Sequence, residues 1–218
     1  MIDFNSTDDE QIAALKAAWQ EHGRAIVTGI VLGIGIIGGW NYWKGFKLTR
    51  AQQGSELYAQ AETAVGSNDI AALKQSVSAL EADYSATPYL ALGQLALAKA
   101  QAESGNYAEA EAALRAVIAD AKYAETRDLA KLRLASVLNA AGQHQQALDT
   151  LSGQLAVAYS GLADEHRGDA LHGLGQVDAA RAAYDRALDS TPNAEFLRWK
   201  RDTLGDATSA SDNAADAS

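Results

Sequence analysis

Residues 25 to 43 form an apolar run, AIVTGIVLGIGIIGGWNYW, that contains no ionisable side chain. As an α-helix this run is about 28 Å long, close to the ~30 Å hydrocarbon core of a bilayer. Arg24 and Lys44 flank it, and Trp40 and Trp43 lie near its end, where amphipathic rings favour the headgroup level. A cleaved signal peptide is disfavoured because the preceding segment is long and acidic. A buried core helix of this length would normally contain a polar residue. We therefore predict a single-pass transmembrane helix.

The apolar run divides the chain of 218 residues into unequal parts. We predict four segments: a leader with a short amphipathic helix (1–24), a transmembrane anchor (25–43), a folded domain (44–204) and a disordered tail (205–218). The net charge of −10 falls entirely after residue 50, because the first fifty residues hold five basic and five acidic side chains. Such an acidic domain repels phosphate backbones, which argues against nucleic-acid binding. The absence of cysteine excludes disulfides and thiolate catalysis.

A glycine recurs in the large segment at intervals of 39, 37 and 33 residues: Gly66, Gly105, Gly142 and Gly175. Five positions after each glycine stands an alanine: Ala71, Ala110, Ala147 and Ala180. Seven positions before each stands a small residue: Ala59, Ala98, Ala135 and Gly168. Nine positions after, three of the four repeats have a bulky residue: Leu114, Leu151 and Tyr184, with Gln75 as the exception. A glycine ends a helix without strain, and facing small residues let consecutive helices approach closely. The pattern predicts four helical hairpins.

The two best copies cover residues 89–118 and 161–192. The first resembles the tetratricopeptide repeat at Gly105, Tyr107 and Ala110. We therefore predict an all-α fold: a single N-terminal transmembrane helix, then a tetratricopeptide-like solenoid of about four hairpins and a capping helix. The paired helices are expected at 48–65 with 69–83, 88–104 with 107–120, 123–141 with 144–157, and 160–174 with 177–190. The alternative is an alanine-rich helical bundle, because its Ala and Leu would show the same period of 3.6 residues.

The sequence contains no motif for catalysis or cofactor binding. It lacks a P-loop, a Rossmann glycine pattern, a G-x-S-x-G elbow and an H-E-x-x-H pair. His166 and His172 are six positions apart, on different faces of a helix, and no carboxylate pair completes a metal site with them. We therefore expect a non-enzymatic protein with no catalytic residue, no cofactor, no metal site and no small-molecule substrate.

Two sets of residues are candidates for contacts with other proteins. A solenoid of helical hairpins has a groove that binds peptide segments. The repeat register assigns to this groove Glu56, Gln60, Lys99, Glu103, Ser136, Asn139, Glu165, Asp169 and His172. Within the anchor, small residues spaced by four allow close packing against another membrane helix. The anchor residues of this kind are Ala25, Gly29, Gly33, Gly35 and Gly39.

The order of these features resembles one family. The leader DDEQIAALKAAWQEHG, the glycine-rich span ending in GWNYWKG and the acidic repeat domain together resemble the YfgM family of ancillary SecYEG translocon subunits. The resemblance implies a single-pass inner-membrane protein with a cytoplasmic N-terminus and a periplasmic repeat domain. It also implies two partners, the SecYEG translocon and a membrane-anchored, PpiD-like periplasmic chaperone. The implied role is to assist the handover of secreted chains to periplasmic chaperones.

The residues alone leave orientation and role open. Lys16 and Arg24 precede the span, whereas Lys44, Lys47 and Arg50 follow it, which gives almost no bias under the positive-inside rule. One alternative function is a membrane-anchored scaffold for the assembly of another inner-membrane complex. A second alternative is an enzyme without a recognisable motif.

Overall fold

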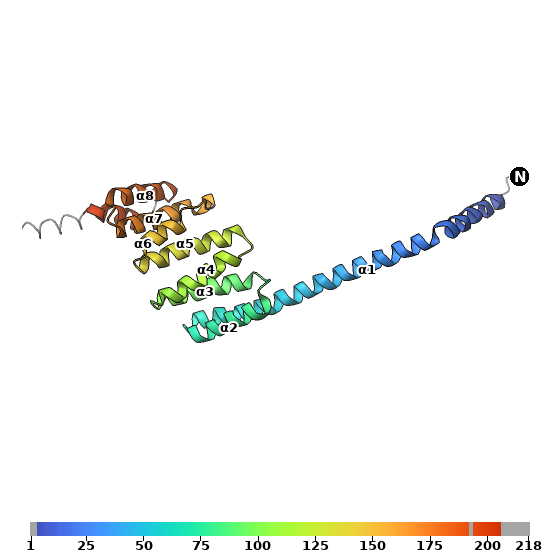
Figure 1. Ribbon diagram of the computed structural model, residues 1–218, viewed down its shortest axis with the longest axis horizontal. Helices are drawn as coiled ribbons and strands as arrows, with labels where there is room; N and C mark the ends of the chain where they lie inside the picture. Colours follow the sequence, from blue (N-terminus) through green and yellow to red (C-terminus); the bar gives the residue numbers. More distant parts are fainter. Residues whose placement is uncertain (1–3, 192–193, 206–218) are drawn as a thin grey trace, which may run out of the picture. The chain divides into compact units, whose positions relative to one another are not determined.

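The computed structural model describes residues 4–191 and 194–205. These residues form nine α-helices and two short 3-10 helices, and no strand occurs among them (Figure 1). The predicted all-α class is confirmed. The chain divides into two compact units, Met1–Gln52 and Gln53–Ser218. The tail that was predicted to be disordered lies outside the described residues from 206 onward.

Helix α1 runs without interruption over Phe4–Gly66. The leader, the apolar run and the first helix of the repeats are therefore one helix, not three separate elements. Among the described residues, α1 is the one helix long and apolar enough to cross a membrane, and none of its most apolar stretch is buried. Its large apolar side chains are exposed, from Val27 to Ile37 and on to Trp43. This exposure is expected of a helix surrounded by lipid and not of a helix in a soluble core.

The second unit consists of four helical hairpins and a final helix. The end of α1 pairs with α2 (Ile70–Tyr84), α3 (Tyr89–Glu103) with α4 (Tyr107–Asp120), α5 (Ala124–Ala140) with α6 (His144–Thr150), and α7 (Ser160–Gly173) with α8 (Val177–Ser190). Helix α9 (Glu195–Asp202) follows, and the 3-10 helices are η1 (Val157–Tyr159) and η2 (Thr203–Gly205). Figure 1 shows the hairpins stacked in chain order. The predicted solenoid with its capping helix is confirmed.

The small residues of the repeat pattern lie in the contacts between paired helices. Ala98, Ala110, Ala135 and Ala147 are each at most 1% exposed. At Gly168 even a Cβ atom has no room, since it would lie 2.5 Å from the ring of the buried tyrosine on α8. All three bulky residues of the pattern are buried: Leu114, Leu151 and Tyr184. In the last hairpin, Tyr184 packs in one cluster with Leu197 and Leu204, which follow the hairpin.

The first hairpin has a different register from the one predicted. Its left-handed turn residue is Asn68, with φ of 54°, and not Gly66. Asparagine tolerates this conformation because its short side chain forms local hydrogen bonds. Counting from Asn68 places Ala61, Leu73 and Val77 at the repeat positions, and all three are buried. The turn residues are then spaced by 37, 37 and 33. The misassigned residues are exposed: Ala59, Ala71 and Gln75.

Helix α6 ends at Thr150, seven residues before its predicted end. Gly153 follows closely, and glycine is a poor helix former. The Leu151 carbonyl oxygen accepts a hydrogen bond of 2.6 Å from Arg167 Nη2. Farther along the loop, the backbone N–H of Ala156 donates to Asp128 Oδ2 at 3.0 Å. Contacts with α5 and α7 therefore hold this segment as a loop.

Candidate protein-interaction groove

The first helices of the four hairpins share one partly exposed face. Each hairpin has one left-handed turn residue: Asn68, Gly105, Gly142 or Gly175. Positions two, six, nine and thirteen before each of these residues lie on the same side of a helix, because they are three or four residues apart. We call this surface the groove stripe. Its members are Ser55, Ala59, Glu62 and Gly66 on α1, Leu92, Ala96, Lys99 and Glu103 on α3, Leu129, Arg133, Ser136 and Ala140 on α5, and Leu162, His166, Asp169 and Gly173 on α7. None of them belongs to the fully buried class.

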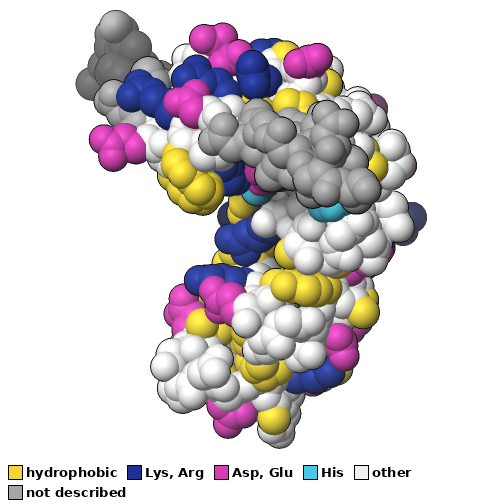
Figure 2. Space-filling view, turned by 90° about the vertical axis from the view of Figure 1, so that its left-hand side faces the viewer, with side chains coloured by type: hydrophobic (Ala, Val, Ile, Leu, Met, Phe, Trp, Pro, Cys, Tyr) yellow, Lys and Arg dark blue, Asp and Glu magenta, His cyan; other side chains and the backbone are white. Residues whose placement is uncertain are grey.

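Hydrogen bonds between successive first helices show that the stripe is continuous from α3 to α7. Arg133 Nη1 on α5 donates to the Leu95 carbonyl oxygen on α3 at 3.3 Å. Asn139 Nδ2 on α5 donates to the His166 carbonyl oxygen on α7 at 2.9 Å. The first helices therefore lie side by side. Figure 2 shows a surface of the repeat domain that is hollowed between its ends, with basic and hydrophobic side chains in the hollow.

Two aromatic rings lie beside the stripe near Glu62 on α1, and one arginine of the stripe lies near them. The rings of Tyr58 and Tyr89 pack with centroids 5.9 Å apart. Burial and the neighbouring Glu62 carboxylate raise the pKa of Tyr58, whereas Arg133 acts in the opposite direction. Leu92 is 40% exposed at the same level of α3. Rings provide apolar contact area, and a guanidinium binds carbonyl or carboxylate oxygens, so this part is suited to a peptide segment.

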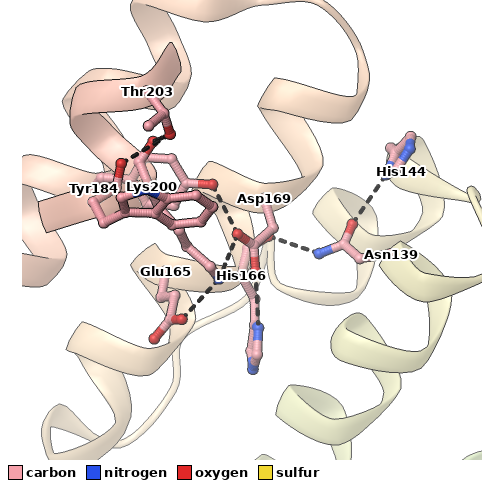
Figure 3. A network of polar contacts seen from close by, with 9 residues as sticks. Asn139, His144, Glu165, His166, Asp169, Tyr184, Lys200 and Thr203 are labelled. Carbon is pink, nitrogen blue, oxygen red and sulfur yellow. Dashed lines mark hydrogen bonds and ion pairs between the residues drawn. The ribbon is translucent and has the colours of Figure 1, made fainter. Parts of the chain in front are cut away.

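The other end of the stripe is occupied by the chain itself (Figure 3). Lys200 on α9 donates to Glu165 Oε1 at 2.9 Å and to both oxygens of Asp169 at 2.8 and 3.0 Å. The Tyr184 hydroxyl on α8 donates to Asp169 Oδ1 at 2.7 Å. His166 Nδ1 lies 3.8 Å from Asp169 Oδ2, which is too far for a hydrogen bond. We call these five residues the cap network, because they connect α7 and α8 to the final helix.

The cap network holds Asp169 in its charged form. Burial by itself raises the pKa of this carboxyl, but nearby His166 and the hydrogen bonds from Lys200 and Tyr184 outweigh burial and lower the pKa to about 2. For Lys200, burial lowers the pKa, and the two carboxylates outweigh that effect and raise it. Burial and the Asp169 carboxylate raise the pKa of Tyr184. At neutral pH the network is therefore an ion pair with a neutral tyrosine.

The structure separates the predicted groove residues into three groups. Asn139, Glu165 and Asp169 are engaged within the domain, as described above. Lys99 and Glu103 form an exposed ion pair of 3.7 Å on α3, and Ser136 and His172 are also exposed. Glu56 and Gln60 are exposed on α1, but the corrected register places Glu62, two residues after Gln60, at the position equivalent to Lys99.

Three residues of the groove were missed by the sequence analysis: Tyr58, Arg133 and Lys200. Alignment of the first hairpin on Asn68 places Glu62 on the groove stripe. Tyr58 is four residues before Glu62, one helical turn away, so this alignment could have identified it. Arg133 stands three residues before Ser136, on the same helix face, so its position was a usable signal. The contact of Lys200 with α7 spans more than thirty residues and left no signal in the repeat pattern.

The small residues of the anchor present an open surface. A Cβ atom built on Gly29, Gly33, Gly35 or Gly39 would meet nothing within 4 Å apart from its chain neighbours and the backbone of its own helix. Ala25 is exposed as well. The predicted contact of this face with another membrane helix stays a prediction.

A family model described as "Tetratricopeptide repeat-like domain" matches residues 16–206, which include the apolar run and the whole solenoid. The chain belongs to this family. Three curated relatives of this tetratricopeptide repeat-like protein carry the name "Ancillary SecYEG translocon subunit". The relative from Escherichia coli (strain K12) is 29% identical over 93% of this chain and 99% of its own length.

The relatives from Haemophilus influenzae (strain ATCC 51907 / DSM 11121 / KW20 / Rd) and Aggregatibacter actinomycetemcomitans are each 27% identical, over 86% of this chain and 91% of their own lengths. These names confirm the resemblance to the YfgM family that the leader, the span and the repeats predicted. No solved structure matches the chain significantly.

Proposed function

We propose that this tetratricopeptide repeat-like protein is a membrane-anchored, non-enzymatic interaction subunit of the SecYEG translocon. The observation that carries the proposal is the extent of the similarity to the Escherichia coli subunit, which covers 93% of this chain and 99% of that protein. Similarity limited to the repeats would say little, because solenoids of this type present binding surfaces in unrelated proteins. Here it includes the leader and the apolar run as well.

The proposed topology has residues 1–24 in the cytoplasm and the repeat domain in the periplasm. Its support is the family resemblance, because the basic residues around the span are almost balanced. The chain lacks cysteine, so single cysteines at Ser6 and at the exposed Ser78 report the side of each segment. A membrane-impermeant thiol reagent is expected to label position 78, and not position 6, in intact spheroplasts. The reverse labelling would refute this topology and favour a cytoplasmic scaffold.

The anchor and the groove are proposed to bind different partners. The translocon is largely embedded in the bilayer, so the open glycine face of α1 is the surface that reaches it. The groove stripe and the two tyrosine rings beside it offer rings and an arginine to a soluble segment, from a PpiD-like chaperone or from an emerging secreted chain. The protein would then hold a secreted chain or its chaperone beside the channel and assist handover.

Copurification of the full-length protein with SecYEG tests the anchor. Gly29→Leu with Gly33→Leu keeps the span apolar but prevents the close approach of another membrane helix. We therefore expect this variant to lose copurification with SecYEG. Ile30→Leu with Ile34→Leu is the matched control, because both isoleucines are exposed on the same helix, and SecYEG is expected to be retained. Undiminished SecYEG in the glycine variant, with loss on deletion of residues 53–204, would place the contact on the repeats.

Photocrosslinking in intact cells tests the groove. A photoreactive residue at Leu92, on the groove stripe, is expected to capture a periplasmic chaperone or a secreted chain. The same residue at Ala112, exposed on α4, is the matched control and is expected to capture neither. Equal products from both sites would exclude the groove as the working surface. Capture of a subunit of another inner-membrane complex from Leu92 would support the scaffold function instead.

A further inference from the structure

Three aromatic rings and three cations lie on α1 at the end of the apolar run and directly after it, between residues 40 and 50. Each cation lies over the ring four residues before it, one helical turn earlier. The distances from cation to ring centroid are 5.4 Å for Lys44 over Trp40, 3.6 Å for Lys47 over Trp43 and 5.1 Å for Arg50 over Phe46. The two tryptophan rings also contact each other, with centroids 5.3 Å apart. The six residues form one continuous strip, which we call the ring–cation strip.

The strip occupies one side of the helix. At 100° per residue, positions 40, 43, 44, 46, 47 and 50 fall within about half of the helix circumference. The opposite half carries no charge between residues 40 and 50: Asn41, Tyr42, Gly45, Leu48 and Thr49. All cations of this segment therefore face the same way, and a ligand on that side would meet three positive charges within about two turns.

The two lysines keep donors for a ligand. A ring covers one side of each ammonium group and accepts no conventional hydrogen bond, so N–H groups of Lys44 and Lys47 remain available to phosphate oxygens. Within the described part of the chain, Lys44 and Lys47 form no ion pair with a carboxylate. Both lysines and Arg50 are exposed. The rings limit the movement of the long side chains, which lowers the entropy lost when an anion binds.

We propose that the ring–cation strip is a binding site for the headgroups of anionic phospholipids. The inference rests on the proposed membrane anchoring, which places the end of the apolar run at the bilayer interface. Tryptophan rings favour that level, and the cations just beyond it lie at the level of lipid phosphates. The chain that follows residue 50 carries the entire net charge of −10 and is repelled by an anionic surface. The strip offsets this repulsion where the chain leaves the membrane and fixes the depth of α1.

Fluorescence quenching by brominated lipids tests the site in the full chain. The protein has four tryptophans, so Trp19→Phe with Trp199→Phe leaves Trp40 and Trp43 as reporters. Vesicles contain phosphatidylcholine with either brominated phosphatidylglycerol or brominated phosphatidylcholine. We expect stronger quenching by phosphatidylglycerol, with a preference of up to about fivefold per cation that falls as salt is added.

Charge removal at the two ends of the span gives the matched comparison. Lys44→Gln with Lys47→Gln is expected to reduce the preference several-fold, whereas Lys16→Gln with Arg24→Gln, which removes the same charge before the span, leaves it unchanged. Equal quenching by both lipids in the parent protein, or a preference that the Lys44 and Lys47 changes leave undiminished, would overturn the headgroup site while the anchor stands. Absence of quenching by either lipid would overturn the membrane anchoring itself. Displacement of phosphatidylglycerol by millimolar inorganic phosphate would show a simple phosphate site and also refute the proposal.

Discussion

Replacing Asp169 by Asn removes one of the two carboxylates that connect α9 to the last hairpin. The carboxylate accepts hydrogen bonds from Tyr184 at 2.7 Å and from Lys200 at 2.8 and 3.0 Å. Its pKa is lowered from 3.8 to about 2. Because one pKa unit corresponds to about 1.4 kcal/mol, the charged form stabilises the folded domain by about 2 kcal/mol near neutral pH. Asp169→Asn is expected to lower the free energy of unfolding by about this amount.

The effect depends on pH with a definite sign. A carboxyl whose pKa is lower in the folded state contributes its full stabilisation above the unfolded pKa, and loses it as the pH falls through the folded pKa. The cost of Asp169→Asn should therefore be constant from pH 7 to about pH 5 and shrink toward pH 2. Urea unfolding of residues 53–218 measures it, because this unit has its own core. Trp199, the one tryptophan after residue 43, reports the release of α9.

Asp185→Asn is the matched control for charge. Asp185 pairs with Arg201 at 3.2 Å and is more than half exposed, so its loss is expected to cost less than about 1 kcal/mol. A cost of Asp169→Asn equal to that of the control, or one that does not change between pH 7 and pH 3, would refute the assignment of the cap network as a stabilising ion pair.

Three further substitutions test the packing of the repeats, all by urea or thermal unfolding of residues 53–218. Asn68→Ala should lower the free energy of unfolding by about 1 kcal/mol, because residue 68 has a positive φ, whereas Asn68→Gly and Gly66→Ala should change it little. A larger loss for Gly66→Ala than for Asn68→Ala would support the register that the sequence predicted. Ala110→Leu overfills a fully buried site and should cost about 1–3 kcal/mol, and the exposed Ala108→Leu should be nearly neutral. Gly168→Ala should cost a similar 1–3 kcal/mol, since the new methyl would lie 2.5 Å from a ring, and a neutral result would show that the ring is free to move.

The ends of most helices could be predicted from the sequence, because the residues that form each turn are next to the helix ends in the sequence. Gly105, Gly142 and Gly175 all adopt φ near 75°, and the helices before and after them begin and end close to their predicted positions, except for the early end of α6. The first hairpin was misaligned for a local reason too. Gly66 and Asn68 are both able to form a left-handed turn, and glycine is the more frequent choice. Burial of the residues around each candidate decides between them, and burial is a property of the folded chain.

The parts of the groove that could not be predicted depend on contacts between distant residues. The early end of α6 depends on Arg167 and Asp128, which belong to neighbouring helices. The role of Glu165 and Asp169 depends on Lys200, more than thirty residues away. A repeat alignment treats equivalent positions alike, so it assigned these carboxylates to partner binding. The last repeat differs from the others because its neighbour is a capping helix.

Because the cap network occupies the α7 end of the groove stripe, the accessible part of the stripe lies on α1, α3 and α5. There the charges are mixed, because Glu62 and Glu103 are acidic and Lys99 and Arg133 are basic. The large negative charge of the chain after residue 50 therefore does not describe the surface that a peptide would touch. Long-range attraction of basic segments depends on the net charge and is screened by salt, whereas the proposed contact depends on the tyrosine rings and Arg133. We therefore propose that a partner of this groove is selected by its side chains and not by its charge alone.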